Sequence, residues 1–291
     1  MDIVLTLLTI IMTAATPLLL AALGEMVTER AGVLNLGVEG MMVMGAVAGF
    51  GGAYVTGKPW VGIVTSIFAG MLMSLLFGFL TLTLLANQVA TGLALTLLGL
   101  GLSALIGESF VGQPGIKLPT FSGIDPLVLF SLVMVAAVSW FMFRTKMGLV
   151  IRAVGNSHTS AHALGYNVIG VRYLSVLFGG AMSGIAGGYL SLVYTPQWVE
   201  NMTSGRGWIA LALVVFASWL PFRILAGAYL FGTISILSFV LQAQGLGIPS
   251  QFLSSLPYLG TILALVVISG NKALTRRNTP ASLGQPFVPD R

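Results

Sequence analysis

Charged side chains are almost absent from this chain. Its 291 residues include only 13 lysines and arginines and 8 aspartates and glutamates, whereas 56% are hydrophobic. A soluble domain carries about 25% charged residues, because its surface faces water. This composition excludes a soluble enzyme, a disordered chain and a nucleic-acid-binding protein, and the pI of 9.7 rests on too few charges to indicate nucleic acid. Most of the surface must face lipid.

Apolar runs separated by Gly, Pro and charged residues predict an all-α, polytopic integral membrane protein with about 8–10 transmembrane helices. Each such helix needs about 20 apolar residues, and nine segments qualify, the seventh of them short. The predicted spans are residues 3–23, 38–56, 60–85, 89–107, 126–143, 173–194, 208–220, 224–243 and 254–270. The glycines at 180, 184 and 188 share one face of the sixth span, which is typical of close helix packing.

Basic residues predict which loops face the cytoplasm, where Lys and Arg are enriched. The segment of about 144–172, between the fifth and sixth spans, holds four basic residues and no acid, and more basic residues follow the last span. We therefore expect both segments and the C-terminus to be cytoplasmic. The predicted organisation is a transmembrane domain over 1–273 and a cytoplasmic tail over 274–291.

Polar residues are concentrated between Glu25 and Glu39. Asn35 and Glu39 lie four residues apart and would share one face of a helix. One interpretation is a solvated cytoplasmic loop, with the N-terminus outside. The other is a broken helix inside the membrane, where irregular backbone must face protein or a water-filled cavity. A tenth crossing there would put the N-terminus inside, and the polar residues would line a solute pathway.

The basic loop contains signals for a short helix. Asn156 or Ser157 is a good N-cap and Gly165 a good C-terminal residue, which predicts about two helical turns between them. Such a helix suits docking on another protein, although it could also be incidental. His158 and His162 have the spacing of a metal pair, but no third ligand lies near them, so no metal site is expected.

Two further polar groups could contact a solute or a partner. Asn87, Gln88 and Thr91 lie at the start of the fourth span, where they could bind a solute or only a neighbouring helix. The loop before the seventh span holds Trp198, Glu200 and Arg206, which a soluble partner could contact through charge pairs. The alternative for this loop is a simple membrane anchor.

The motifs of catalysis and nucleotide binding are missing from the sequence. There is no phosphate-binding GxxxxGK[ST] segment and no arrangement of nucleophile and base. We therefore expect no catalytic residue on this chain. The energy for any transport must come from a partner.

Four segments occur in a characteristic order: ERAGVLNLGVEGMM at 29–42, ANQVATGLAL at 86–95, RAVGNS with ALGYNV within 152–168, and GRGWIALAL at 205–213. With PASLGQP at 280–286 they resemble the permease subunits of ATP-binding-cassette (ABC) importers. The closest resemblance is to the branched-chain amino acid and simple-sugar permease superfamily, in its nucleoside-type branch. It covers nearly the whole chain.

The resemblance implies a type II ABC importer-like permease whose segment 144–172 couples to an ATPase subunit. The coupling positions carried over by the resemblance are Arg152, Gly155, Asn156, Ala161 and Gly165. Relatives often have an acidic residue after the Asn, so the docking surface here would be neutral or more cationic. Ala161→Asp is expected to leave insertion normal and to abolish coupling.

The resemblance also implies partners and a location. The partners would be ATP-binding cassette ATPase subunits, a second permease subunit in a heterodimer or homodimer, and an extracytoplasmic solute-binding protein or lipoprotein. ATP and Mg would bind to the ATPase, with no cofactor on this chain. The location would be the bacterial cytoplasmic (inner) membrane.

The expected function is the import of a small polar solute, first a nucleoside. A monosaccharide, a branched-chain amino acid or a riboflavin-like vitamin is the alternative within the class. A secondary transporter or channel, using Glu39 with Glu108, is the alternative of another class, and a membrane scaffold is a third. The predicted pathway residues are Asn35, Glu39, Asn87, Gln88 and Thr91.

Overall fold

The computed structural model describes residues 2–120, 123, 125–243, 249–269 and 278–288, and within these ranges it contains helices and no β-strand. The helices are α1 (Asp2–Arg30), α2 (Val38–Thr56), α3 (Pro59–Gly78), η1 (Phe79–Thr83), α4 (Gln88–Gly107), η2 (Glu108–Phe110), α5 (Pro126–Arg144), α6 (Lys146–Asn156), α7 (His158–Ala163), α8 (Val168–Tyr189), η3 (Leu190–Tyr194), α9 (Arg206–Phe216), α10 (Pro221–Ala243) and α11 (Ser250–Ser269). The all-α prediction is confirmed.

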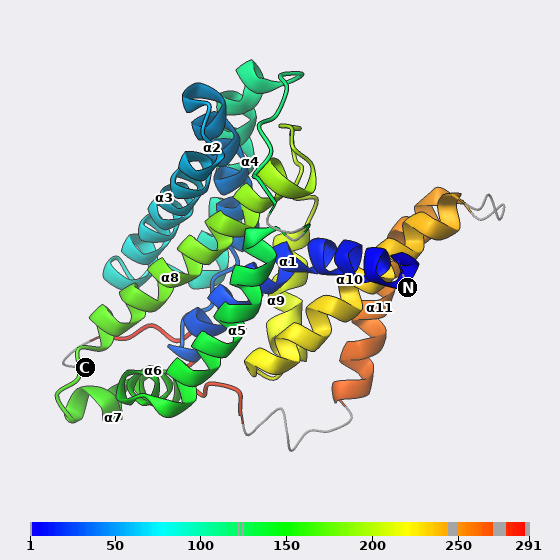
Figure 1. Cartoon of the computed structure of the whole chain (residues 1–291). Helices are drawn as coiled ribbons and strands as arrows, with labels where there is room; N and C mark the ends of the chain where they lie inside the picture. The colour runs from blue at the N-terminus through cyan, green and yellow to red at the C-terminus, as the bar shows by residue number, and fades with distance from the viewer. Residues whose placement is uncertain (1, 121–122, 124, 244–248, 270–277, 289–291) are drawn as a thin grey trace.

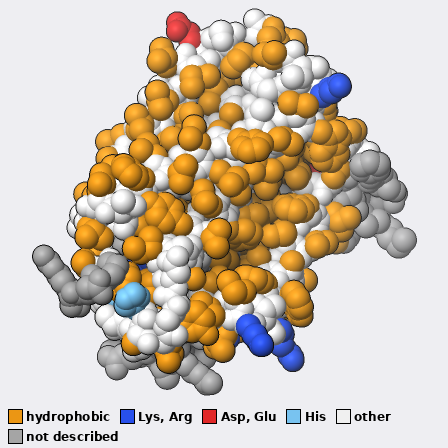
Figure 2. Space-filling view, turned by 90° about the vertical axis from the view of Figure 1, so that its left-hand side faces the viewer, with side chains coloured by type: hydrophobic (Ala, Val, Ile, Leu, Met, Phe, Trp, Pro, Cys, Tyr) orange, Lys and Arg blue, Asp and Glu red, His pale blue; other side chains and the backbone are white. Residues whose placement is uncertain are grey.

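Seven helices in the described part of the chain are long and apolar enough to cross a membrane. They are Thr6–Arg30, Val38–Thr56, Pro59–Thr83, Gln88–Phe110, Pro126–Arg144, Val168–Tyr194 and Pro221–Gln242. At the short seventh predicted span lies α9, with 11 residues, and at the ninth lies α11, with 20 residues. Figure 2 shows the hydrophobic surface that results, with charged side chains at its margins.

The centre of the bundle is α8, which packs against α1, α2 and α3. Figure 1 shows α2, α3 and α4 gathered on one side of it and the α10–α11 hairpin at the opposite edge of the molecule. Glycines allow the helices to approach closely, because a Cβ on Gly45 would overlap the backbone of Gly184 and a Cβ on Gly70 would overlap the carbonyl oxygen of Gly180. The predicted packing role of these glycines is confirmed.

Neither interpretation of residues 24–37 describes the structure fully. Helix α1 continues to Arg30 instead of ending near residue 23, and residues 31–37 are non-helical. The solvated-loop interpretation is wrong, because Glu25, Glu29 and Asn35 are each at most 1% exposed. The chain does break inside the protein, but the break adds no tenth helix between α1 and α2.

Candidate functional site

The carboxylate of Glu39 joins the start of α2 to the start of α9. It is 2% exposed, and its Oε1 accepts hydrogen bonds from the Thr203 hydroxyl at 2.5 Å and the Gly205 N–H at 2.8 Å. Its Oε2 accepts a bond from the Gly207 N–H at 2.6 Å. The first N–H groups of a helix lack partners within that helix and carry partial positive charge. An acid from α2 therefore caps α9.

The two glycines of the GRG sequence make this cap possible. Gly205 precedes α9 with a φ of 81°, in the left-handed region that favours glycine. A Cβ on Gly207 would lie 2.6 Å from the Glu39 Cα, so no larger residue fits there without a shift. The two glycines therefore give the backbone the conformation and the space that the Glu39 carboxylate needs to reach the start of α9.

Helix α9 is too short to cross a membrane by itself. An 11-residue helix rises about 16 Å, roughly half of a 30 Å hydrocarbon core. Its far end leads to Trp219, whose carbonyl accepts a 3.0 Å bond from Arg30 at the end of the first span. Short or interrupted helices with polar ends inside a bundle of membrane helices are typical of transport sites.

Polar side chains of neighbouring helices satisfy the backbone of the non-helical segment 31–37. Gln88 Oε1 accepts a bond from the Leu34 N–H at 2.8 Å, and Glu25 Oε1 accepts one from the Asn35 N–H at 3.2 Å. The Thr96 hydroxyl donates to the Leu36 carbonyl at 3.1 Å. Irregular backbone at membrane depth is stable only when protein or enclosed water provides such partners. The non-helical segment is therefore stabilised by specific hydrogen bonds from α1 and α4.

Both ends of α9 are thus tied to the polar segment between Glu25 and Glu39. At the far end, Trp219 Nε1 donates to Glu29 Oε2 at 2.5 Å, and Arg30 binds the carbonyl of the same Trp219. A movement of α9 would therefore displace residues at both ends of the 25–39 segment, through these hydrogen bonds.

The structure brings together three of the five predicted pathway residues. Asn35, Glu39 and Gln88 are buried along the interrupted segment. Asn87 lies exposed as the N-cap of α4, and Thr91 is half-buried one turn later. The buried oxygens of this group accept bonds from the protein itself, so contact with a solute stays a prediction.

The short helix expected in the basic loop is present as α7. Its N-cap is Ser157, whose hydroxyl accepts a bond from the Ser160 N–H at 3.3 Å, and Gly165 follows it with a φ of 87°. The helix α6 just before it was not predicted. Together α6 and α7 form a compact platform at one end of the bundle, beside the C-terminal tail (Figure 1).

The carried-over coupling positions differ in exposure. Arg152, Asn156 and Gly165 are partly or fully exposed, whereas Gly155 is buried and Ala161 is 3% exposed. An aspartate at 161 would place a charge in an apolar cluster, which is costly. The prediction that Ala161→Asp abolishes coupling stays a prediction, but this variant would also disturb packing, because Ala161 is buried.

Exposed apolar side chains lie just after α7, within the ALGYNV motif but at positions not among the predicted coupling residues. Leu164 is 78% exposed and Tyr166 is 45% exposed. An exposed apolar residue is common on this lipid-facing protein, but these two lie beside the polar turn at Gly165, next to the basic loop. They are better placed than Ala161 to touch a docking partner.

The C-terminal tail binds both α6 and the interrupted segment 31–37. The Ser282 N–H donates to the Gly155 carbonyl at 2.9 Å, and its hydroxyl donates to the Asn156 carbonyl at 3.2 Å. The Gly284 N–H donates to the Gly32 carbonyl at 3.1 Å. The tail thus joins α6 directly to the chain between α1 and α2.

Phe287 anchors the tail beneath α7. Its ring is 6% exposed and packs in a cluster with Ala161, and its centroid lies 5.3 Å from each of the imidazoles of His158 and His162. The two histidines therefore hold an aromatic ring. No group of three His, Cys, Asp or Glu that could bind a metal ion occurs in the described ranges.

Arg172 connects the same parts from α8. It is 1% exposed, and its guanidinium donates to the carbonyls of Ala31 at 3.2 Å and Gln285 at 3.0 Å. Partial burial and the Arg172 charge lower the pKa of His158 below its ordinary value. A neutral imidazole can accept a bond from the guanidinium, which lies 3.4 Å from His158 Nδ1.

The three predicted docking residues of the loop before α9 differ in exposure. Trp198 is 2% exposed and packs against Val43 and Phe50, so its ring supports the loop from below and is not a docking contact. Arg206 begins α9 and lies over the Tyr194 ring at 5.3 Å. Only Glu200 is fully exposed, beside a groove of about 490 Å³ between residues 111–115 and 196–200.

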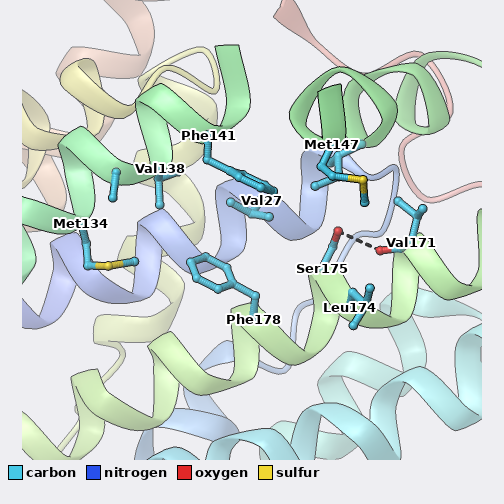
Figure 3. A pocket seen from close by; sticks show the side chains of 11 residues that line it. Val27, Met134, Val138, Phe141, Met147, Val171, Leu174, Ser175 and Phe178 are labelled. Carbon is cyan, nitrogen blue, oxygen red and sulfur yellow. Dashed lines mark hydrogen bonds between the residues drawn. The ribbon is translucent and has the colours of Figure 1, made fainter. Parts of the chain in front are cut away.

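A separate pocket is lined by apolar side chains and one serine (Figure 3). It has a volume of about 340 Å³ and lies between α1, α5, α6 and α8. Its single hydroxyl, from Ser175, donates to the Val171 carbonyl at 3.0 Å. Since no polar group remains free to orient a polar solute, this pocket does not suit one.

The family model for the permease component of branched-chain amino acid transport systems matches residues 7–269. The chain belongs to this family. It is therefore a permease subunit of an ABC transporter and a multi-pass membrane protein, and it is not itself the ATPase. Membership removes the secondary-transporter, channel and scaffold alternatives.

Similar permeases carry different solute names. The putative glucose ABC transporter permease TsgC13 of Haloferax volcanii is 40% identical over 94% of each chain. The guanosine permease NupQ of Bacillus subtilis is 33% identical, over 94% of this permease and 93% of NupQ. The nucleoside permease NupC of Lactococcus lactis subsp. cremoris is 30% identical, over 88% and 90%. No solved structure gives a significant match.

Proposed function

We propose that this permease carries a nucleoside into the cell as part of an ATP-driven importer of the cytoplasmic membrane. The observation that carries the proposal is its similarity, over about nine tenths of each chain, to permeases named for guanosine and for nucleosides. The interrupted, acid-capped helices supply the internal polar region that passage of a polar solute requires.

A monosaccharide is the second candidate. It is favoured by the 40% identity to a permease named, as putative, for glucose. Nucleosides and monosaccharides share a ring bearing several hydroxyl groups, so one polar pathway could suit either. Selection would then depend on the soluble binding protein.

Competition experiments distinguish the two solutes. The assembled importer, reconstituted in vesicles with its binding protein and ATP, should take up labelled guanosine, and unlabelled nucleosides should compete at least tenfold better than glucose. A nucleoside that neither enters nor competes, together with ATP-dependent glucose uptake, would refute the nucleoside assignment and leave the importer assignment intact.

The basic residues of α5 and α6 favour a cytoplasmic position for the α6–α7 platform and the tail. An ATPase subunit, which holds ATP and Mg, would dock on this platform. A second permease subunit would complete the transmembrane part. A solute-binding protein would dock at the opposite end, near the groove beside Glu200.

Leu164→Ser tests the docking surface. Leu164 is 78% exposed, so the substitution should leave the Tm unchanged but remove about 2 kcal/mol of apolar contact with the ATPase. Binding of the ATPase subunit should weaken by more than tenfold, measured by its retention on the purified permease. Val55→Ser is a matched control, because Val55 is also 78% exposed but lies at the end of α2. Equal ATPase binding by both variants would contradict the assignment.

A further inference from the structure

A polar cleft of about 500 Å³ opens at the end of the bundle that carries the coupling helices. Its walls come from the ends of α1 and α5, from α6 and from the start of the tail. The lining residues are Arg30, Phe143, Leu149, Arg152, Ala153, Asn156 and Asn278. This lining contains two arginines and no acid.

The two arginines share one aromatic ring. The guanidinium carbon of Arg30 lies 5.9 Å from the centre of the Phe143 ring, and that of Arg152 lies 5.1 Å from the same centre. The ring attracts each cation, but the lining of the cleft holds no acid that would neutralise the two like charges at this ring. An anion bound in the cleft would neutralise these charges.

Arg30 also has an unused donor. Its side chain is 7% exposed and its Nη2 binds the Trp219 carbonyl, whereas its Nε has no hydrogen-bond partner. A buried donor without a partner is unfavourable. Since the Arg30 side chain lines the cleft, an oxyanion bound there can accept hydrogen bonds from this guanidinium group.

We infer that this cleft binds a phosphate-type oxyanion between Arg30 and Arg152. Guanidinium groups match the oxygens of a phosphate, and the amides of Asn156 and Asn278 add further donors. The same chemistry occurs in the headgroup of an anionic phospholipid and in free phosphate. Basic pockets at the cytoplasmic ends of transmembrane helices commonly take the former.

Bound phosphate would join two separate parts of the fold. Arg152 belongs to α6, whereas Arg30 binds Trp219 beyond the end of α9. An oxyanion bridging the two arginines would hold the coupling platform against the capped helix. The inference requires only this cleft, so it stands or fails independently of the transported solute.

The full chain, purified in a neutral detergent, tests the inference by its thermal unfolding. Inorganic phosphate is titrated against chloride at equal ionic strength, and vesicles of phosphatidylcholine are compared with vesicles that also contain phosphatidylglycerol. The wild type should gain Tm with one of the two phosphates. In Arg152→Gln the apparent affinity should fall at least about tenfold, because one charge-assisted bond is lost.

Arg144→Gln is the matched control, since Arg144 is an exposed cation of the same corner that does not line the cleft. It should respond as the wild type does. A response to inorganic phosphate supports a site for the free anion, and a response to phosphatidylglycerol alone supports a lipid headgroup site. No response in the wild type, or equal responses in the two variants, would overturn the inference.

Discussion

Glu39→Gln is expected to reduce solute uptake at least about tenfold while the protein still inserts into the membrane. Glutamine keeps the shape of the side chain, but its NH₂ group would face one of the three donors that the carboxylate now accepts from, in Thr203, Gly205 and Gly207. A hydrogen bond to a charged group is worth about 1.5–3 kcal/mol. The favourable interaction of the charge with the start of α9 would also be lost.

The measurements are ATP-dependent uptake by the reconstituted importer and the Tm of the purified permease. Glu108→Gln is the control, because Glu108 is exposed at the end of α4. It should retain wild-type uptake and Tm. Wild-type uptake by Glu39→Gln would show that the cap on α9 is unnecessary for transport.

Phe287→Ala is expected to uncouple ATP hydrolysis from uptake. Removing a buried phenylalanine ring costs about 3–5 kcal/mol, and here the loss falls on the contact between the tail and α7. The platform would then be held less firmly to the segment 31–37. ATP hydrolysis by the assembled importer should continue, while uptake falls about tenfold or more.

Phe222→Ala provides the comparison, because Phe222 is 62% exposed near the start of α10. Its ratio of solute transported to ATP hydrolysed should stay at the wild-type value. Helix content, measured by circular dichroism, should be unchanged in both variants. A wild-type ratio in Phe287→Ala would mean that the tail does not transmit the motion.

The spans and the short helix could be predicted because their causes are local. Runs of apolar residues locate the spans, and Ser157 and Gly165 set the limits of α7 through their own hydrogen bond and φ angle. The packing role of Gly184 was also visible, because small residues at four-residue spacing indicate a close helix contact.

The polar centre could not be predicted because its partners are far apart in the sequence. Glu39 and Gly207 are separated by 168 positions, and Ser282 and Asn156 by 126. The charges at 25–30 suggested that α1 had ended, whereas tertiary partners such as Trp219 let the helix continue. Trp198 was predicted as an exposed residue, but its ring is buried against Gly107, which has no side chain to exclude it. This contact also joins residues far apart in the sequence.

The position of Phe287 under α7 also constrains the order of assembly. The ribosome makes residues 282–287 after α1–α11, yet these residues complete the contact among Gly32, Gly155 and α7. The helices can insert during translation, but the contacts of the tail with α6 and α7 can form only after residues 282–287 have been made. A chain that stops before residue 282 would lack these contacts, and α6 and α7 would then be held less firmly to the chain between α1 and α2.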